Sequence, residues 1–190
     1  SFKERGAANA MMQLSEESRR RGVIAASAGN HALALACLGN ALGIAVSVVM
    51  PKHAPLIKAA TCRRYGARVI HHGESFDESR QYADELKQRE GLRYVHGYDD
   101  PAVIAGQGTL GLEMIEQSEE LEALIVPIGG GGLIAGVATA AKAKAPRVRI
   151  IGVEASRMAN YSAALAAGRP VAIPGQPTLA DGLAVGCVGI

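Results

Sequence analysis

Short apolar runs alternate with longer segments of mixed polarity along most of the chain. The runs are rich in Val, Ile and Ala, whereas the segments between them carry apolar residues at helical spacing, and several end at a glycine. This pattern predicts strands at residues 23–26, 45–50, 68–71, 93–96, 124–128 and 148–153. It predicts helices at residues 1–17, 31–41, 56–65, 76–89, 103–116, 133–145 and 156–167.

Strands separated by helices of this length indicate parallel sheets with helices on both faces, so the sequence predicts an α/β fold. In such sheets, ligands bind beyond the carboxyl ends of the strands. Two glycine-containing loops fall at such ends, Ser27–Asn30 and Gly129–Gly132. We therefore expect the functional site at these loops. The glycines at 106, 108 and 111 interrupt a predicted helix and are expected to permit close packing.

Composition sets the broad class of the protein. The chain has 190 residues, 48% of them hydrophobic, which is enough for a substantial core. The 20 basic residues nearly balance the 18 acidic ones and are scattered apart from Arg19–Arg21, which we interpret as a solvated helix end. No nucleic-acid partner is expected. The longest apolar run, residues 43–50, is strand-sized, so no membrane span is expected either.

The cysteines and the chain ends bear on location and completeness. Cys37, Cys62 and Cys187 are odd in number and widely spaced, which favours reduced thiols and a cytoplasmic location. The chain begins with Ser rather than Met, turns into a Gly- and Pro-rich loop at residues 168–177 and ends at Ile190 without a closing element. We therefore expect a fragment of a longer protein.

Lys3 stands at a predicted helix start, where Ser1 and Glu4 fit a capping box. Most lysines are surface residues. At a helix N-terminus, however, the dipole disfavours an ammonium and lowers its pKa, which suits a nucleophile and a base. Phe2 offers a flat apolar surface against which an aromatic cofactor could pack.

The four glycines at Gly129–Gly132 could form a flexible linker, but they connect an apolar strand to an apolar helix, which favours phosphate binding by free backbone amides. The run lacks a following Gly-Lys-Ser/Thr and the Gly-x-Gly-x-x-Gly spacing, so a nucleotide fold is the weaker alternative. Asn30 could adopt a left-handed turn, or its amide could donate to a phenolate oxygen of a cofactor. A phosphorylated aldehyde acting on an amino acid would use the lysine and both loops.

Several polar residues stay unassigned or carry bland interpretations. His31 is left without a role, since a histidine at a helix start is more often structural. His71 and His72 are adjacent in a strand, point to opposite faces and make a poor pair of metal ligands. Carboxylates near strand boundaries, at Glu122, Glu154 and Asp181, are most often solvated.

Four motifs together carry a family resemblance. They are Ser-Phe-Lys-Glu-Arg-Gly-Ala at 1–7, Ser-Ala-Gly-Asn-His at 27–31, Ile-Ala-Gly-Gln-Gly-Thr at 104–109 and Pro-Ile-Gly-Gly-Gly-Gly-Leu at 127–133. In this order they resemble the pyridoxal 5'-phosphate enzymes of fold type II, most closely the threonine dehydratases (threonine ammonia-lyases). The resemblance covers essentially the whole chain, and no single motif would be specific.

The resemblance implies a role for each motif. Lys3 carries the cofactor as a Schiff base and acts as the catalytic base, while Phe2 packs against the cofactor ring and Asn30 binds its 3-oxygen. The substrate carboxylate binds the loop formed by Ser27, Ala28, Gly29 and Asn30. The cofactor phosphate binds Gly129, Gly130, Gly131, Gly132 and Leu133.

The resemblance also implies an architecture and an activity. Two open parallel-sheet domains are expected: a smaller α/β domain at residues 22–100, and a larger one to which residues 1–21, with the lysine, and 101–190 belong. The implied reaction is the deamination of L-threonine, and of L-serine, to 2-oxobutyrate or pyruvate plus ammonia, in amino-acid metabolism such as isoleucine biosynthesis. The family is commonly a homo-oligomer. It normally has a segment before the lysine and a C-terminal part that supplies Ser or Cys to the pyridine nitrogen.

Close relatives differ at one position of the substrate loop. Serine racemases of this fold usually carry a second serine where Ala28 stands, so the chain is predicted to be a one-base dehydratase. A racemase, another hydroxy-amino-acid dehydratase and a catalytically incomplete cofactor-binding fragment stay open as alternatives. A β-replacing synthase would have a different lysine motif and a Thr-Ser-Gly-Asn type of loop. Some relatives bind a divalent cation at a glutamate matched by Glu154, with Glu122 and Asn160 near the other ligand positions.

Overall fold

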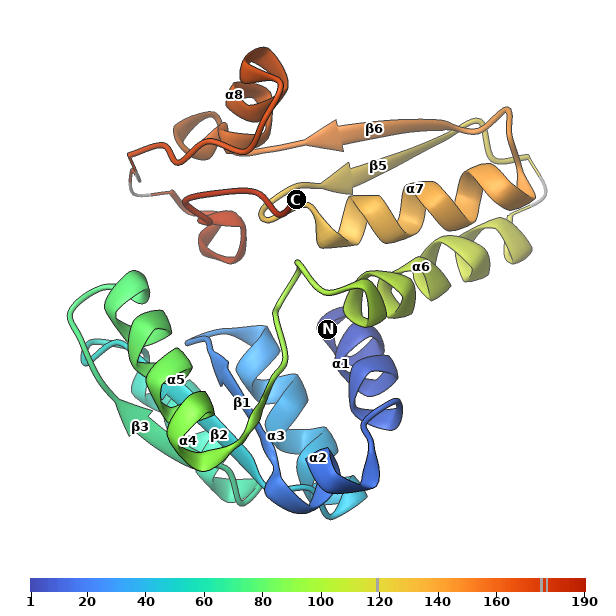
Figure 1. The fold of residues 1–190 in the computed structure, drawn as a ribbon. Helices are drawn as coiled ribbons and strands as arrows, with labels where there is room; N and C mark the ends of the chain where they lie inside the picture. Colours follow the sequence, from blue (N-terminus) through green and yellow to red (C-terminus); the bar gives the residue numbers. More distant parts are fainter. Residues whose placement is uncertain (119, 175, 177) are drawn as a thin grey trace. The chain divides into compact units, whose positions relative to one another are not determined.

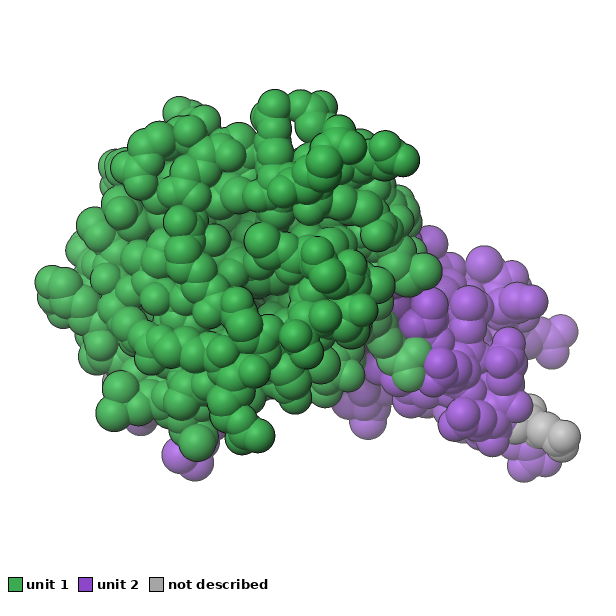
Figure 2. Space-filling view, turned by 90° about the horizontal axis from the view of Figure 1, so that it is seen from below, with its two compact units in different colours: residues 1–97 green, residues 98–190 purple. Residues whose placement is uncertain are grey.

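The computed structural model describes residues 1–118, 120–174, 176 and 178–190. The chain divides into two compact units, residues 1–97 and 98–190, which Figure 2 shows in different colours. Each unit contains a parallel sheet with helices packed on it (Figure 1), so the predicted α/β class is confirmed.

The sheet of the first unit has four parallel strands in the order β3-β2-β1-β4. They are β1 (Val23–Ala26), β2 (Val46–Met50), β3 (Arg68–His71) and β4 (Arg93–Tyr94). Every residue of β1 and β2 is buried. This burial explains why both strands are continuous apolar runs rather than alternating ones.

Five helices belong to the first unit: α1 (Lys3–Met12), α2 (Glu16–Arg21), α3 (Asn30–Leu42), α4 (Leu56–Arg64) and α5 (Phe76–Glu90). Helix α1 packs on α3, and α3 also contacts α4 and β2. Helix α5 lies across β1 and β2, as Figure 1 shows. Its buried residues Ala83 and Leu86 form a core with Ile24, Val49 and Tyr94.

The second unit is built on two parallel strands, β5 (Ala123–Pro127) and β6 (Arg149–Val153). Its helices are α6 (Pro101–Glu116), α7 (Gly132–Lys144) and α8 (Asn160–Ala167), with short 3-10 turns at Ser156–Met158 and Asp181–Leu183. Its core joins Leu124 and Val126 of β5 to Val137 and Ala141 of α7, together with Val148.

Helices α6 and α7 lie side by side (Figure 1) because glycines remove side chains from their contact. A Cβ on Gly136 of α7 would stand 2.2 Å from the carbonyl oxygen of Ile104 on α6. A Cβ on Gly108 would stand 3.0 Å from the oxygen of Gly136. The expectation that the glycines of this helix permit close packing is confirmed for Gly108 and Gly111, the latter facing Val137.

Most predicted elements are found with boundaries shifted by one or two residues, but two predicted helices are each divided. The helix expected at residues 1–17 ends at Met12, and α2 begins after Ser15, whose Oγ accepts from the amide of Ser18 at 3.2 Å. The helix expected at residues 156–167 is a 3-10 turn followed by α8. Local capping groups therefore divide stretches that hydrophobic pattern alone joins.

The strand expected at residues 93–96 ends at Tyr94. Val95 still donates its amide to the Ile24 carbonyl at 3.0 Å, but the next residues leave the sheet. Arg19–Arg21 form the last turn of α2, as the interpretation of a helix end predicted, and Gly22 is its C-cap. The loop predicted at residues 168–177 contains no helix or strand where it is described, and residues 175 and 177 lie outside the described part.

The division into units differs from the predicted domains in two respects, and the first is the boundary, which follows residue 97 rather than residue 100. Second, residues 1–21 are grouped with the first unit, because α1 packs on α3. Their membership of the larger domain in longer relatives stays a prediction, since contacts within this chain do not test it.

Two general expectations can be compared with the fold. Among the described residues, no helix is both long enough and apolar enough to cross a membrane. Cys37, Cys62 and Cys187 are free thiols, and burial raises the pKa of the Cys62 thiol.

Candidate active site

Lys3 is the first residue of α1 and lies against the end of the first unit's chain. Its ammonium donates a hydrogen bond to the carbonyl of Gly97 and stands 5.3 Å from the centre of the Phe2 ring. The amino nitrogen of Ser1 donates to Glu4 at 2.9 Å, while Ser1 Oγ accepts from the amide of Lys3 at 3.4 Å. The glutamate bond of the expected capping box is therefore present. The serine oxygen accepts from the amide of Lys3 instead of the amide of Glu4.

Burial lowers the pKa of Lys3 to about 8. The prediction of a lowered pKa is confirmed in direction, and the cause is loss of hydration around the ammonium. An amine with this pKa is partly unprotonated near neutral pH, as a nucleophile or general base must be.

The loop of residues 27–30 follows β1 at the carboxyl end of the sheet, as predicted. The Ser27 amide donates to Val49 at 3.0 Å and so continues the β1–β2 ladder for one residue. Its hydroxyl oxygen then accepts from the amides of Gly29 at 3.2 Å and Ala32 at 3.4 Å. Ser27 thus shapes the loop through its side chain.

Asn30 is exposed and begins α3. Among the described residues, every backbone with positive φ is a glycine, so the left-handed interpretation of Asn30 is wrong. An exposed amide at a helix start leaves the ligand-binding interpretation in place as a prediction. Ala28, beside it in the loop, has no group that can exchange a proton.

The glycine loop connects β5 to α7 in the second unit, as predicted. Gly131 has a φ of +94° and is the N-cap of α7, a conformation that side chains rarely adopt. A Cβ on Gly130 would stand 2.3 Å from the Tyr98 ring, and a Cβ on Gly132 would stand 2.4 Å from the Tyr98 carbonyl oxygen. Three of the four glycines are therefore required by backbone shape or by close contact.

Tyr98 was not identified from the sequence, although it shapes the glycine loop. Its ring covers Gly130, and its hydroxyl donates to the Cys187 carbonyl at 3.1 Å. The amide of Gly189 donates to the Gly130 carbonyl at 3.0 Å. No local signal marks these residues, because the contacts join parts of the chain far apart in sequence.

A cavity of about 330 Å³ lies beside the glycine loop within the second unit. Gly130, Gly131 and Gly132 line it together with Tyr98 and Tyr161. Gly131, the N-cap of α7, provides no side-chain cap, and Gly131 and Gly132 at this helix start line the cavity.

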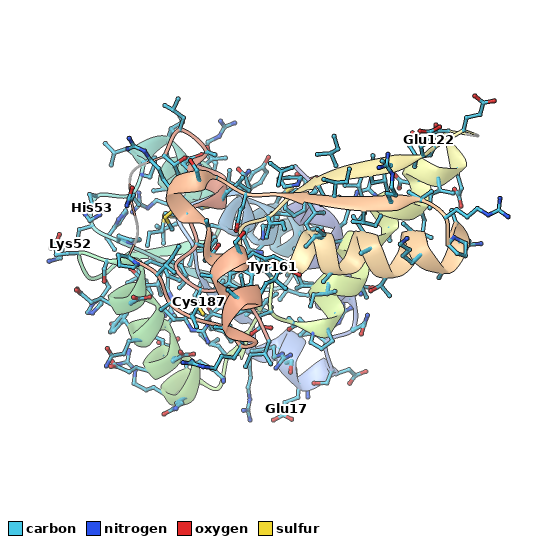
Figure 3. The ribbon with its side chains drawn as sticks, turned by 90° about the horizontal axis from the view of Figure 1, so that it is seen from above. Glu17, Lys52, His53, Glu122, Tyr161 and Cys187 are labelled. Carbon is cyan, nitrogen blue, oxygen red and sulfur yellow. The ribbon has the colours of Figure 1, made fainter. Side chains whose placement is uncertain are left out.

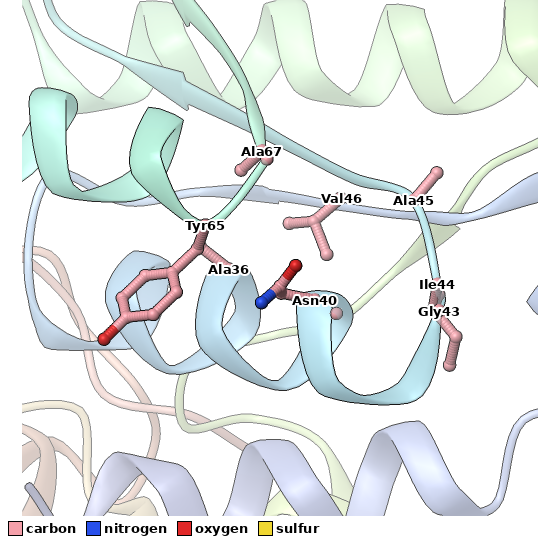
Figure 4. Close-up of a pocket in the computed structure, with 10 residues that line it drawn as sticks. Ala36, Asn40, Gly43, Ile44, Ala45, Val46, Tyr65 and Ala67 are labelled. Atoms are coloured by element: carbon pink, nitrogen blue, oxygen red, sulfur yellow. The ribbon is translucent and has the colours of Figure 1, made fainter.

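A second cavity, of about 240 Å³, lies in the first unit (Figure 4). Its lining includes the residues just before β2 and β3, so it lies at the opposite end of the parallel sheet from the 27–30 loop, which follows β1. It lies where α3 meets β2 and α4 meets β3, and Asn40 and Tyr65 are its polar side chains. The remaining lining is glycine and small or aliphatic side chains. Nothing in this lining resembles a reaction centre.

The predicted cation site at Glu154 lacks one of its expected neighbours. Strands β5 and β6 are parallel, so Glu122 before β5 and Glu154 after β6 lie at opposite ends of the sheet, about 20 Å apart along the strand direction. Figure 3 shows Glu122 far from Tyr161, whose amide donates to Glu154 at 2.9 Å. The placement of Glu122 near the other ligand positions is therefore wrong.

Glu154 instead serves the N-terminus of α8. Its two carboxylate oxygens accept from the amides of Tyr161 and Ser162. Asn160 donates its side-chain amide to the Val185 carbonyl at 2.6 Å. No group of three or more His, Cys, Asp or Glu suited to a metal ion occurs among the described residues. The described residues do not assemble the expected ligand set, and cation binding at Glu154 stays a prediction.

Comparison with known proteins decides the family. A family model described as pyridoxal-phosphate dependent enzyme matches residues 1–189. The chain belongs to this family. The aldehyde and the phosphate of pyridoxal phosphate suit the two features described above, a partly buried amine of lowered pKa and a glycine loop with a cavity beside it.

Individual proteins that resemble this pyridoxal-phosphate enzyme chain match it over nearly its whole length. It is 49% identical over 185 residues to the L-threonine ammonia-lyase of Thermotoga maritima, covering 97% of this chain and 46% of the relative. It matches the solved structure of threonine deaminase isoform 2 from Solanum lycopersicum with a TM-score of 0.95 and 46% identity, over 100% of this chain and 55% of the other. Serine racemase from Dictyostelium discoideum gives 0.90 and 35%, over 100% of this chain and 60% of the other. The chain thus spans about half the length of these relatives.

Proposed function

We propose that the chain carries active-site residues of an L-threonine ammonia-lyase, which forms 2-oxobutyrate and ammonia from L-threonine, and pyruvate and ammonia from L-serine. The observation that carries the proposal is the partly buried Lys3 amine with its pKa of about 8, in a chain 49% identical to an L-threonine ammonia-lyase. The fold-type resemblance of the four motifs supports the same reaction.

Residues of the first unit suit the aldehyde end of pyridoxal phosphate, and residues of the second unit suit its phosphate end. Lys3 would hold the aldehyde carbon, Phe2 would pack against the ring and Asn30 would donate to its 3-oxygen. Gly129–Gly132 and Leu133 would hold the phosphate, since a Cβ at Gly130 or Gly132 would collide with Tyr98 and displace the amides from their positions. When bound, the cofactor supplies an electron sink for the pair left on the substrate Cα.

Residues of this chain would orient the substrate and accept the proton from its Cα. The loop of Ser27, Ala28, Gly29 and Asn30 would bind the substrate carboxylate and align the Cα–H bond. Lys3 Nζ would accept that proton, and the β-hydroxyl would leave with a proton as water. Water then hydrolyses the enamine product, through its imine form, to the keto acid and ammonia, so one water is lost and one is consumed.

The main competing activity is serine racemization, since a serine racemase is among the similar structures. Racemization needs a second proton donor on the opposite face of Cα, and Ala28 has none. We therefore propose a one-base lyase. Formation of D-serine from L-serine at a rate comparable with pyruvate formation would contradict this assignment.

Visible absorbance with pyridoxal phosphate tests the lysine directly. The wild-type chain and the surface variant Lys144→Ala should both develop the absorbance of a lysine-bound cofactor, and Lys3→Ala should not. Identical spectra for wild type and Lys3→Ala would show that the lysine assignment is wrong. A normal spectrum without keto-acid formation from threonine would favour a catalytically incomplete cofactor-binding fragment.

We further propose a cytoplasmic homo-oligomer. Three free cysteines support a reducing compartment, and the family resemblance supports the oligomer. Sedimentation of the purified protein would measure its assembly, and a monomer at every concentration would contradict the oligomer.

A further inference from the structure

The segment that follows β4 is held by side chains from two helices. Strand pairing ends when the Val95 amide donates to Ile24 at 3.0 Å. The Val95 carbonyl then lies 2.9 Å from His31 Nε2, and the Gly97 carbonyl accepts from the Lys3 ammonium. Because a carbonyl can only accept, the His31 ring carries its proton on Nε2. The two contacts bind one short segment to the starts of α3 and α1.

His31 also contacts the residue whose carbonyl meets Lys3. A Cβ on Gly97 would lie 3.4 Å from Cδ2 and 3.5 Å from Cγ of His31, so the imidazole packs against the Gly97 backbone. His31 is 5% exposed. A buried ring that both bonds to Val95 and packs on Gly97 leaves the backbone between them little freedom to turn.

We propose that His31 is a positioning residue for Lys3: by fixing residues 95–97, it aims the Gly97 carbonyl at the Lys3 amine. This inference rests on the proposed function, in which Lys3 accepts the substrate proton. The carbonyl then stabilises the ammonium that results and holds the amine at the start of α1 whenever it is free. His31 touches neither substrate nor cofactor in this role.

The contact between the Gly97 carbonyl and the Lys3 ammonium should affect the pKa of Lys3. Burial disfavours the Lys3 ammonium and is the cause of its lowered pKa. A hydrogen bond to a charged group acts in the opposite direction and is worth roughly tenfold in equilibrium. If the Gly97 carbonyl is displaced, the ammonium form of Lys3 loses this hydrogen bond, and the pKa of Lys3 should therefore fall further.

Competitive labelling of Lys3 in the apoprotein tests the positioning role without any turnover. The protein is treated with limiting acetic anhydride across a pH series, and mass spectrometry follows acetylation at Lys3. His31→Asn loses the Nε2 donor, whereas His31→Gln places an amide N–H near the same point. His53→Asn, at an exposed histidine of the same unit, is the matched control.

The expected result is a labelling midpoint that falls by roughly one pH unit in His31→Asn and stays near the wild-type value in His31→Gln and His53→Asn. A midpoint unchanged in His31→Asn would overturn the proposal. A rise toward the ordinary value of 10.5 would also overturn it, because the histidine would then keep Lys3 buried rather than aim a carbonyl. These outcomes concern the free amine, so they are distinct from failure of the cofactor spectrum or of keto-acid formation.

If His31→Asn does not fold, nitrogen NMR of the wild-type histidine ring keeps the proposal testable. The ring should be in the form protonated at Nε2, with that proton in slow exchange. A ring protonated only at Nδ1 could not donate to Val95 and would overturn the proposal.

Discussion

The lowered pKa of Lys3 suits the proposed chemistry and also lowers the stability of the fold. Burial lowers its pKa from 10.5 to about 8, so the folded protein binds this proton less tightly than the unfolded chain does. The same shift that frees the amine for chemistry therefore destabilises the fold wherever the amine is charged.

Replacement of Lys3 by Met should stabilise the apoprotein at pH 7 by about 1–2 kcal/mol, because the partly buried ammonium is removed and the apolar stem is kept. The unfolded state holds more protons than the folded state between pH 8 and 10.5, so wild-type stability rises through that window. The advantage of the variant should shrink accordingly. Urea unfolding at several pH values measures this, with Lys144→Met as the exposed control; an advantage that does not depend on pH would contradict the burial argument.

At the scale of elements, the end of β1 depends on a side chain from β4. Strand β4 has two residues, so the buried Ala26 amide at the end of β1 has no strand partner on that side. The Tyr94 hydroxyl accepts from this amide at 3.2 Å, and the Arg80 guanidinium lies 3.9 Å from the centre of its ring. Burial raises the pKa of Tyr94, so the hydroxyl stays neutral. The Tyr94 hydroxyl thus supplies the missing hydrogen-bond acceptor at the end of β1, the strand that leads into the 27–30 loop.

Tyr94→Phe should lower the free energy of unfolding by about 1–3 kcal/mol, because the Ala26 amide is left buried without an acceptor. Tyr65→Phe removes a hydroxyl from a side chain that is 38% exposed and should change stability little. Urea unfolding of the two variants gives the comparison. Equal stability of both variants with the wild type would mean that water reaches the Ala26 amide.

At the scale of the whole molecule, the proposed cofactor contacts come from both compact units. Lys3 and the 27–30 loop belong to the first, and the glycine loop with Tyr98 belongs to the second. Each half is organised by contacts within its own unit. The aldehyde and phosphate contributions to binding should therefore be separable by mutation.

Gly131→Ala should weaken binding of pyridoxal phosphate by roughly tenfold or more and leave binding of pyridoxal, which lacks the phosphate, nearly unchanged. The cause is the φ of +94° at Gly131, which alanine adopts only with strain. Gly43→Ala carries the same kind of strain at φ +66° in open space in the other unit and is the matched control. Equilibrium dialysis with both aldehydes measures the effect; an equal loss for both would argue against phosphate binding at this loop.

The candidate site could be predicted in part. The residues that were identified from the sequence and those that were missed differ in the kind of signal they carry. Lys3, Asn30 and the glycine run stand out because a helix start or a strand-to-helix turn is a local signal. The break before α8 and the capping role of Glu154 were missed, because hydrophobic spacing does not report which side chain will accept an amide. The family resemblance placed Glu122 near the other cation-ligand positions, but the parallel pairing of β5 and β6 puts it at the opposite end of the sheet from Glu154.

The sequence by itself determined the α/β class, the order of strands and helices, the two loops and the family motifs, because each depends on residues close together along the chain. The tertiary structure decided the contacts of those motifs. Tyr98 meets Gly130, and Lys3 meets the Gly97 carbonyl 94 residues away. Such pairings arise only when separate elements pack, and the burial that results sets the pKa of Lys3.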